Sequence, residues 1–277
     1  ISKLSYSEFI NSLQGIGEIE TLGLCSDGVN DVYAVHIDSK AKHNIVITSG
    51  THGQHEWTAP YWNRKFFQYL VNPETSFNPQ LFNYLRYAFN WHWIPIVNPF
   101  GYNSGVSEWK TKGDIIYRYN ANGVDINRNF PVNWDLVLYE PKGTEPFSEV
   151  ESQYIRDLVL TYNPVVELDW HTYGSDENLT STNQRMFEVD LLTQDFLKTF
   201  KFGTSETTRF GNPEENLSMI NNWASTIISS LGIPCFASTP EIGYHQHKMN
   251  RELEVFPFLK RTVLRNQIWF VASGVQL

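Results

Sequence analysis

The sequence predicts a single α/β domain with a mixed, mostly parallel, twisted sheet and helices on both faces. Short β-branched or aromatic runs alternate with helical patterns along the 277 residues, which is the order expected when helices connect parallel strands. The hydrophobic share of 41% and the aromatic share of 15% allow a large buried core. No internal repeat or low-complexity tract divides the chain, so one domain over residues 1–277 is expected.

The first half of the chain predicts two strands and one helix. Residues 45–48 are a β-branched run that ends at a Ser-Gly turn, as a buried strand does. Residues 57–70 follow a helical pattern, and Pro60 is tolerated there because it lies in the first turn. Residues 91–97 predict a second strand, which an Asn-Pro pair closes.

Three helices are predicted in the second half. Ser148 and Glu151 have the spacing of a capping box, in which each side chain bonds the backbone of the other residue. The apolar face of the helix that they open consists of Val150, Tyr154, Ile155, Leu158 and Val159. Residues 217–231 predict a second helix that stops at Gly232, and residues 258–272 predict a closing helix.

Polar residues follow three of the predicted strands. A strand at residues 165–170 runs directly into His171, and one at residues 235–238 ends just before Glu241. His52 follows the first strand in the same way. In sheets of this class a ligand site lies outside the carboxyl ends of the strands. Three side chains that can bind metal or protons therefore indicate a site at this edge of the sheet.

Charge and cysteine content exclude several classes of protein. The formal net charge of -9 argues against nucleic acid or an anionic membrane as a partner. No apolar run of membrane-spanning length and no signal pattern is visible, so we expect a soluble protein of unassigned compartment. A start at Ile1 indicates a processed form or a domain excised from a longer chain. Cys25 and Cys235 are distant and predict two buried thiols, without a disulfide framework or a cysteine zinc site.

The segment after the first strand has the composition of a metal site. Catalytic zinc needs three nitrogen or oxygen ligands and one open position. His52 and Glu56 lie at a strand-to-helix junction, where Gly53 allows a tight turn. His171 supplies a remote third ligand. We therefore predict one Zn²⁺ held by His52, Glu56 and His171.

Five motifs in order resemble the zinc metallocarboxypeptidases of the funnelin type, the carboxypeptidase A/B-like proteins. They are a His and a Glu after a strand, Asn-Pro-x-Gly, Gly-Val-Asp-x-Asn-Arg, a remote His-x-Tyr and a late Glu. Here they fall at His52 with Glu56, at residues 98–101, 123–128 and 171–173, and at Glu241. The resemblance covers the chain from about residue 22 to its end. It implies the zinc carboxypeptidase/phosphorylase-hydrolase-like fold and a single peptidase domain.

The resemblance also implies an activity, namely hydrolysis of the C-terminal peptide bond by a metal-activated water. Glu241 would then be the general base, and Arg118 matches the arginine that stabilises the oxyanion. Asn127 and Arg128 match the pair that binds the terminal carboxylate, for which a guanidinium fork is suited and an ammonium is not. Asp125 is expected to orient the His52 ring. The implied substrate is a peptide or small peptide-like molecule with a free carboxylate.

Two features depart from the family pattern. His52 and Glu56 are separated by one residue more than the family's His-x-x-Glu, so we expect the loop to bulge, because one residue is about 100° of helical turn. The alternative is that His55 is the ligand, which would give a three-His site. The family also carries a mobile tyrosine before its catalytic glutamate. None lies between Phe210 and Glu241, and Tyr244 is the nearest candidate.

Two other functions remain open at this point. Deacylases of the aspartoacylase and succinylglutamate desuccinylase kind share the metal triad and the Asp-x-Asn-Arg element, and they cleave N-acyl amino acids. A catalytically weak binding domain with the same fold would explain the changed His-Glu spacing and the missing tyrosine. The Asn-Pro-x-Gly element favours a peptidase over a deacylase, and the presence of Glu241 argues against a binding domain.

Overall fold

The computed structural model describes residues 2–76, 78–103, 118–173, 177–180, 218–232 and 235–244. The side chains of a few residues inside these ranges, His55 and Glu241 among them, are not described. The closing helix expected at residues 258–272 lies outside the described ranges.

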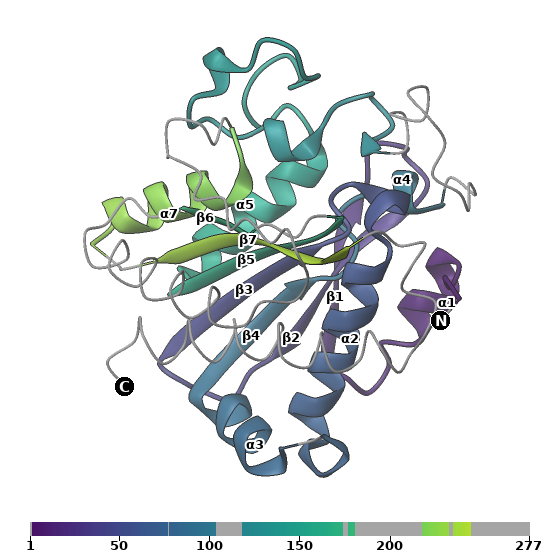
Figure 1. Cartoon of the computed structure of the whole chain (residues 1–277), viewed down its shortest axis with the longest axis vertical. Coiled ribbons are helices and arrows are strands. Elements are labelled where there is room, and N and C mark those ends of the chain that lie inside the picture. The colour runs from purple at the N-terminus through teal and green to yellow at the C-terminus, as the bar shows by residue number, and fades with distance from the viewer. Residues whose placement is uncertain are drawn as a thin grey trace.

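Strands in the described residues form one sheet of seven, in the order β1-β2-β4-β3-β5-β7-β6 (Figure 1). Their bounds are β1 Glu18–Leu24, β2 Asp31–Ile37, β3 His43–Ser49, β4 Phe89–Ile94, β5 Val166–Tyr173, β6 Glu177–Thr180 and β7 Phe236–Tyr244. The central strands β4, β3, β5 and β7 are parallel to one another. The pairs β1–β2, β2–β4 and β6–β7 are antiparallel. The expected mixed, mostly parallel sheet is therefore confirmed.

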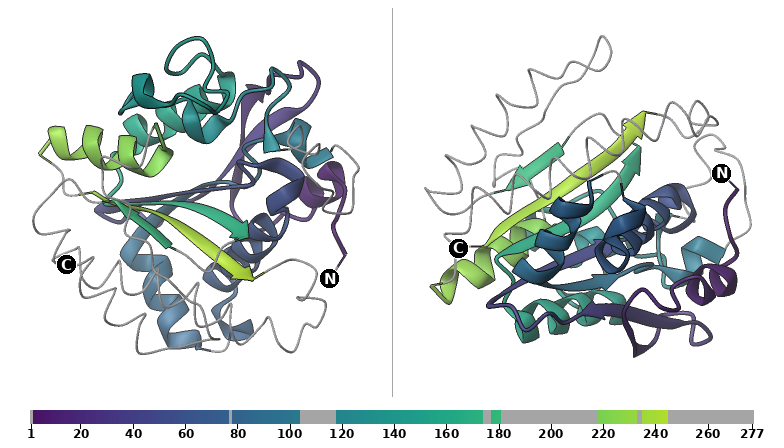
Figure 2. Two further views of the ribbon diagram at one scale, coloured as in Figure 1. Left: turned by 45° about the horizontal axis from the view of Figure 1, so that its top comes forward. Right: turned by 90° about the horizontal axis from the view of Figure 1, so that it is seen from below.

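Helices cover both faces of the sheet, as predicted. The α-helices are α1 Tyr6–Asn11, α2 Thr58–Val71, α3 Pro79–Ala88, α4 Pro99–Asn103, α5 Val150–Tyr162 and α7 Ile220–Ser230. Helices α2 and α3 lie against one face, and α5 and α7 lie against the other (Figure 2). No helix of the described segments is long and apolar enough to cross a membrane.

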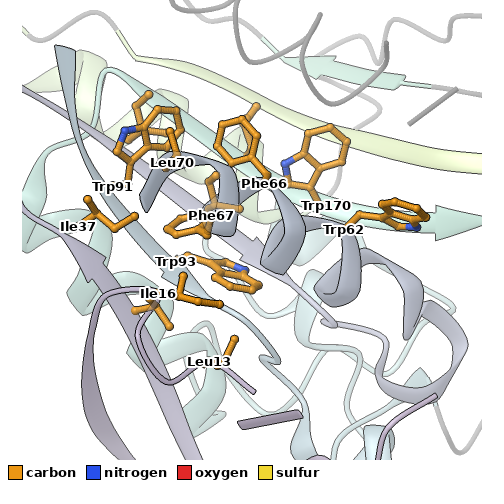
Figure 3. Packing of buried hydrophobic residues seen from close by; sticks show 14 of the residues in the cluster. Leu13, Ile16, Ile37, Trp62, Phe66, Phe67, Leu70, Trp91, Trp93 and Trp170 are labelled. Atoms are coloured by element: carbon orange, nitrogen blue, oxygen red, sulfur yellow. The ribbon is translucent and has the colours of Figure 1, made fainter. Parts of the chain in front are cut away.

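Aromatic side chains dominate the core under α2 (Figure 3). Trp91 and Trp93 alternate with His92 along β4 and so point to the same face. The ring centroids of Phe67 and Trp93 lie 4.8 Å apart, and those of Phe66 and Trp91 lie 5.3 Å apart. Such pairs add about 0.5–1.5 kcal/mol each beyond the burial of their area. This layer fixes the position of α2, whose first turn follows the candidate metal ligands.

A second core lies under α5 and α7. It confirms the predicted apolar face of α5, but the predicted capping box of that helix is absent. Ile155, Leu158 and Val159 are buried on the predicted apolar face of α5. The predicted capping box is wrong, because Glu149 is the N-cap and makes no side-chain capping bond. The Glu151 carboxylate instead accepts hydrogen bonds from the backbone N and the Oγ of Ser26, at 2.8 and 2.5 Å. A partner remote in sequence has therefore replaced the local one.

Strand ends differ from the prediction where tertiary contacts decide them. The strand expected at residues 91–97 ends at Ile94, since Pro95 has no N–H to continue the ladder. The strands expected at residues 165–170 and 235–238 both run further, to Tyr173 and Tyr244. They pair with each other over this extension, so His171 and Glu241 lie within strands rather than after them.

Both cysteines are buried and free, as expected. Cys25 and Cys235 pack in the core on the α5 and α7 face of the sheet. Burial raises the pKa of the Cys25 thiol to about 12. The pair therefore behaves as two small hydrophobic side chains.

Candidate metal centre and active site

A single turn of 3₁₀-helix brings His52 and Glu56 together. Strand β3 ends at Ser49, and the next residue, Gly50, has a φ of +67°, where a Cβ would lie only 3.2 Å from the Cα of Ile96. The turn η1, Gly53–Glu56, then begins at a second left-handed glycine, Gly53, with a φ of +58°. His52 is the N-cap of this turn and Glu56 is its last residue, and His52 Nδ1 lies 2.7 Å from Glu56 Oε1. The segment between the two ligands, where a bulge was expected, is this 3₁₀ turn.

His171 reaches the same point from the neighbouring strand. Strand β5 runs parallel to β3, with Ser49 opposite Trp170. The Nδ1 of His171 lies 2.9 Å from Glu56 Oε1 and 3.1 Å from His52 Nδ1. The three side chains are 2–3% exposed. Among the described residues they are the one group of three or more His, Cys, Asp or Glu whose ligand atoms converge in this way.

A buried aspartate holds each imidazole by its other nitrogen. His52 Nε2 lies 3.1 Å from Asp125 Oδ1, which is the contact expected from the sequence. His171 Nε2 lies 2.6 Å from Asp169 Oδ2. The opposite oxygen of Asp169 accepts hydrogen bonds from Thr48 Oγ1 and Thr51 Oγ1, at 2.8 and 3.0 Å. Both rings are thereby turned with Nδ1 toward Glu56, the arrangement that carboxylate–histidine–metal triads use.

These residues fit one zinc ion. A tetrahedral zinc with bonds of about 2.0–2.1 Å keeps its ligand atoms about 3.3–3.4 Å apart, close to the 2.7–3.1 Å observed between His52, Glu56 and His171. The Oε2 of Glu56 is buried and has no hydrogen-bond partner. Two imidazoles and one carboxylate are the donor set of catalytic zinc, which keeps a fourth position open.

The electrostatics of the site favour a cation. Burial opposes ionisation of Glu56, but the neighbouring His171 and His52 outweigh it and lower the pKa of that carboxyl. Burial opposes protonation of His171, but Asp169 and Glu56 outweigh it and raise the pKa of that imidazole well above its usual value. The buried carboxylates therefore hold positive charge at the point that a metal would occupy.

Asp125 joins the metal ligands to the two candidate substrate arginines. Its Oδ2 accepts a hydrogen bond from Arg118 Nε at 2.9 Å. Its Oδ1 also accepts from the backbone N of Asn127 at 3.0 Å, at the start of the turn η4, Ile126–Arg128. The Asn127 side chain is buried and accepts from the backbone N of Ile220 at 3.0 Å. Asp125 therefore links His52 to the short segment that carries Arg118, Asn127 and Arg128.

The Arg128 guanidinium contacts Glu140, a side chain that the sequence did not predict at this site. Its Nε forms an ion pair with Glu140, and its Nη2 lies 3.4 Å from Glu140 Oε1. Its Nη1 donates to the backbone O of Asn127 at 2.8 Å. Three of its five N–H groups thus have partners in the described chain, and one on Nη1 and one on Nη2 remain for a ligand. No local pattern could have identified Glu140, which lies in a loop.

The backbone of Glu241 lies beside the metal ligands. In the parallel pairing of β5 and β7, Glu241 is the register partner of His171. Tyr244, the candidate for the missing tyrosine, pairs with Tyr173 at the end of the same strands. The side chains of Glu241 and Tyr244 are not described, and neither is that of the alternative ligand His55.

Comparisons with known proteins assign the chain to a family of zinc enzymes. The family model described as zinc carboxypeptidase (Peptidase_M14) matches residues 17–185. Carboxypeptidase B of Astacus astacus is 30% identical over 175 residues, which are 57% of this chain and 55% of that protein. Mast cell carboxypeptidase A of Mus musculus is 24% identical over 199 residues, which are 61% of this chain and 45% of that protein. The chain thus spans about half the length of these curated relatives.

Solved structures match the fold over almost the whole chain. The structure of thrombin activatable fibrinolysis inhibitor superposes with a TM-score of 0.72 at 17% identity, covering 98% of this chain and 73% of that one. Carboxypeptidase A from Helicoverpa armigera superposes with a TM-score of 0.67 at 18% identity, covering 97% and 70%. At these identities the likeness establishes the fold.

Proposed function

The chain belongs to the zinc carboxypeptidase (Peptidase_M14) family, and from this premise we propose that it removes the C-terminal residue of peptides. The observation that carries the proposal is the convergence of His52, Glu56 and His171, with each imidazole oriented by a buried aspartate. Zinc bound there would act as a Lewis acid and lower the pKa of water. The rest of the chemistry belongs to the chain's own side chains.

Glu241 is proposed as the general base and acid. It would take the proton of the attacking water and deliver it to the leaving amine. Its support is the β5–β7 register, which places its backbone directly beside His171. Removing such a group lowers the rate about 10²–10⁴-fold.

Arg118 is proposed to stabilise the oxyanion that develops on the scissile carbonyl. Asp125 Oδ2 accepts a hydrogen bond from its Nε at 2.9 Å, and within the described residues both terminal amino groups of the guanidinium remain for the substrate. A donor fixed in advance is effective because it needs no reorganisation as the negative charge forms. The Arg118 side chain is 33% exposed, so part of it can be reached from solvent.

Arg128 is proposed to bind the free carboxylate of the substrate, with Asn127 setting its position. The two free N–H groups of Arg128, on Nη1 and Nη2, suit a bidentate contact with a carboxylate. This contact would make the protein an exopeptidase, with peptides or peptide-like molecules as substrates. Neither nucleic acid nor an anionic membrane fits a chain of net charge -9.

A pair of peptides tests the proposal. We expect release of the last residue from a peptide with a free C-terminus and little from the same peptide amidated. Glu241→Gln should abolish release, and Glu145→Gln, the same change at an exposed loop position, should not. Equal turnover of the two peptides would exclude an exopeptidase. Turnover of N-acyl amino acids alone would assign a deacylase, and zinc binding without any turnover would assign a binding domain.

A further inference from the structure

A lysine near the start of the chain contacts the metal loop. The Nζ of Lys3 donates hydrogen bonds to the side-chain Oε1 of Gln54 and to the backbone O of Tyr102 in α4. It also lies over the Tyr102 ring, 4.3 Å from its centroid. The Tyr102 hydroxyl donates in turn to the backbone O of Leu4 at 3.1 Å. Lys3 precedes residues 17–185, the part of the chain that the family model matches.

Gln54 occupies the middle of the turn that separates two metal ligands. His52 and Glu56 lie two residues before and two residues after it. The turn η1 is one turn of 3₁₀-helix whose N-cap makes no side-chain capping bond. Such a short turn is marginal by itself, since it fixes several backbone angles for few hydrogen bonds. The left-handed Gly53 adds a further cost in backbone entropy. Contacts from elsewhere in the fold must therefore order η1.

We propose that Lys3 is a positioning residue for the metal centre, which holds η1 through Gln54 and so presets the separation of His52 and Glu56. This role answers a specific need of this chain, because its metal loop is one residue longer than His-x-x-Glu. Lys3 contacts η1 and α4 together, so it ties the turn to a neighbouring helix.

The packing around Lys3 agrees with a fixed contact. Burial lowers the pKa of Lys3 to about 8, as for an ammonium drawn out of water. Such a group is stable where its N–H donors have acceptors, here Gln54 Oε1 and Tyr102 O, and where an aromatic face lies beneath it.

Zinc affinity is the direct measure of this role. The inference rests on the zinc site of the proposed function and not on its peptidase activity, so binding is measured by competition with a chromogenic chelator. Lys3→Met keeps the apolar stem over Tyr102 and removes the donor. We expect it to weaken zinc binding about 10-fold, the lower end of what loss of a supporting contact costs. Lys42→Met, the same change at an exposed position, should leave the affinity unchanged.

The coupling between Lys3 and Gln54 separates positioning from general stability. Gln54→Leu should weaken zinc binding as much as Lys3→Met, and the double variant should be no worse than either, because both remove one contact. Gln54→Glu, which keeps an acceptor for Lys3, should retain the wild-type affinity. Thermal unfolding of the zinc-free variants checks that they fold. If Lys3→Met does not fold, the zinc affinities of Gln54→Leu and Gln54→Glu are compared instead, because both variants keep Lys3.

Three results would overturn the proposal. One is equal zinc affinity in Lys3→Met and Lys42→Met, and another is additive losses in the double variant. The third is a wild-type chain that binds no zinc. A chain that binds zinc with the expected coupling but cleaves no peptide would support the role of Lys3 and overturn the proposed function instead.

Discussion

Asp169 and His171 lie two residues apart on the same face of β5, and Asp169 Oδ2 accepts a hydrogen bond from His171 Nε2 at 2.6 Å. Residues two apart on a strand share a face, so this contact is built into the strand itself. In the neutral form of His171, the form that binds a metal, this contact favours the tautomer with its proton on Nε2 and its lone pair on Nδ1, the nitrogen that faces Glu56.

Replacing Asp169 by asparagine should reverse this tautomer. The Thr48 and Thr51 hydroxyls would retain the amide oxygen and turn its NH₂ toward His171. The ring would then carry its proton on Nδ1, where it blocks metal binding. We expect zinc affinity to fall about 10–100-fold in chelator competition. Asp157→Asn, on an exposed face of α5, is the control, and equal affinities in the two variants would contradict the assignment.

The second metal ligand can be tested by two glutamine substitutions. Glu56 Oε1 lies within 2.9 Å of Nδ1 of both His52 and His171. Glu56→Gln removes a charged ligand and should weaken zinc binding by more than about 100-fold, beyond the usual loss for a supporting residue. His55→Gln should change it by less than about 3-fold if only the supporting loop is affected. The reverse order of effects would establish a three-His site.

The Arg128 side chain should determine whether a free carboxylate is needed. Arg128→Lys keeps the charge but loses the planar fork, so we expect KM for a free-carboxylate peptide to rise about 10-fold or more. The preference over the amidated peptide should shrink with it. Steady-state kinetics on the peptide pair measure both, with Arg156→Lys on α5 as the matched control. An unchanged preference would assign carboxylate binding to another group.

His92 should make the fold sensitive to acid. Desolvation, with the nearby His36 as a smaller cause, lowers the pKa of His92 to about 3. The unfolded chain has a His pKa of about 6.5, so it binds more protons than the native state between these values. Stability is therefore lost as pH falls from about 6.5 toward 3, by roughly 3–5 kcal/mol at most.

Urea unfolding at several pH values measures this effect. His92→Phe should retain the stacking on Tyr162, whose centroid lies 3.4 Å from that of His92, and should flatten the dependence of stability on pH. His43, which is less buried and whose pKa is also lowered, supplies the control substitution His43→Phe. Equal slopes in wild type and His92→Phe would show that other groups cause the acid sensitivity.

Local patterns were sufficient for the central elements of the fold but not for their ends, and they did not predict β1, β2, β6, α1, α3 or α4. The strands β3, β4, β5 and β7 and the helices α2, α5 and α7 all lie where hydrophobic spacing predicted them. The predicted capping box was wrong because Glu151 accepts a hydrogen bond from Ser26, 125 residues away in the chain. The predicted ends of β5 and β7 were wrong because the two strands pair with each other beyond them. Pairing between two strands cannot be predicted from either strand alone.

The sequence by itself determined the class of fold, the two histidines of the metal centre, His52 and His171, and the segment that carries Arg118, Asn127 and Arg128. These are properties of short motifs, whose spacing constrains local geometry. Only the tertiary structure decided which ring nitrogens face Glu56, and that Asp169, Glu140 and Lys3 hold the side chains around them. Hydrogen bonds between residues far apart in the chain depend on strand register and loop path, which follow from the packing of the whole domain.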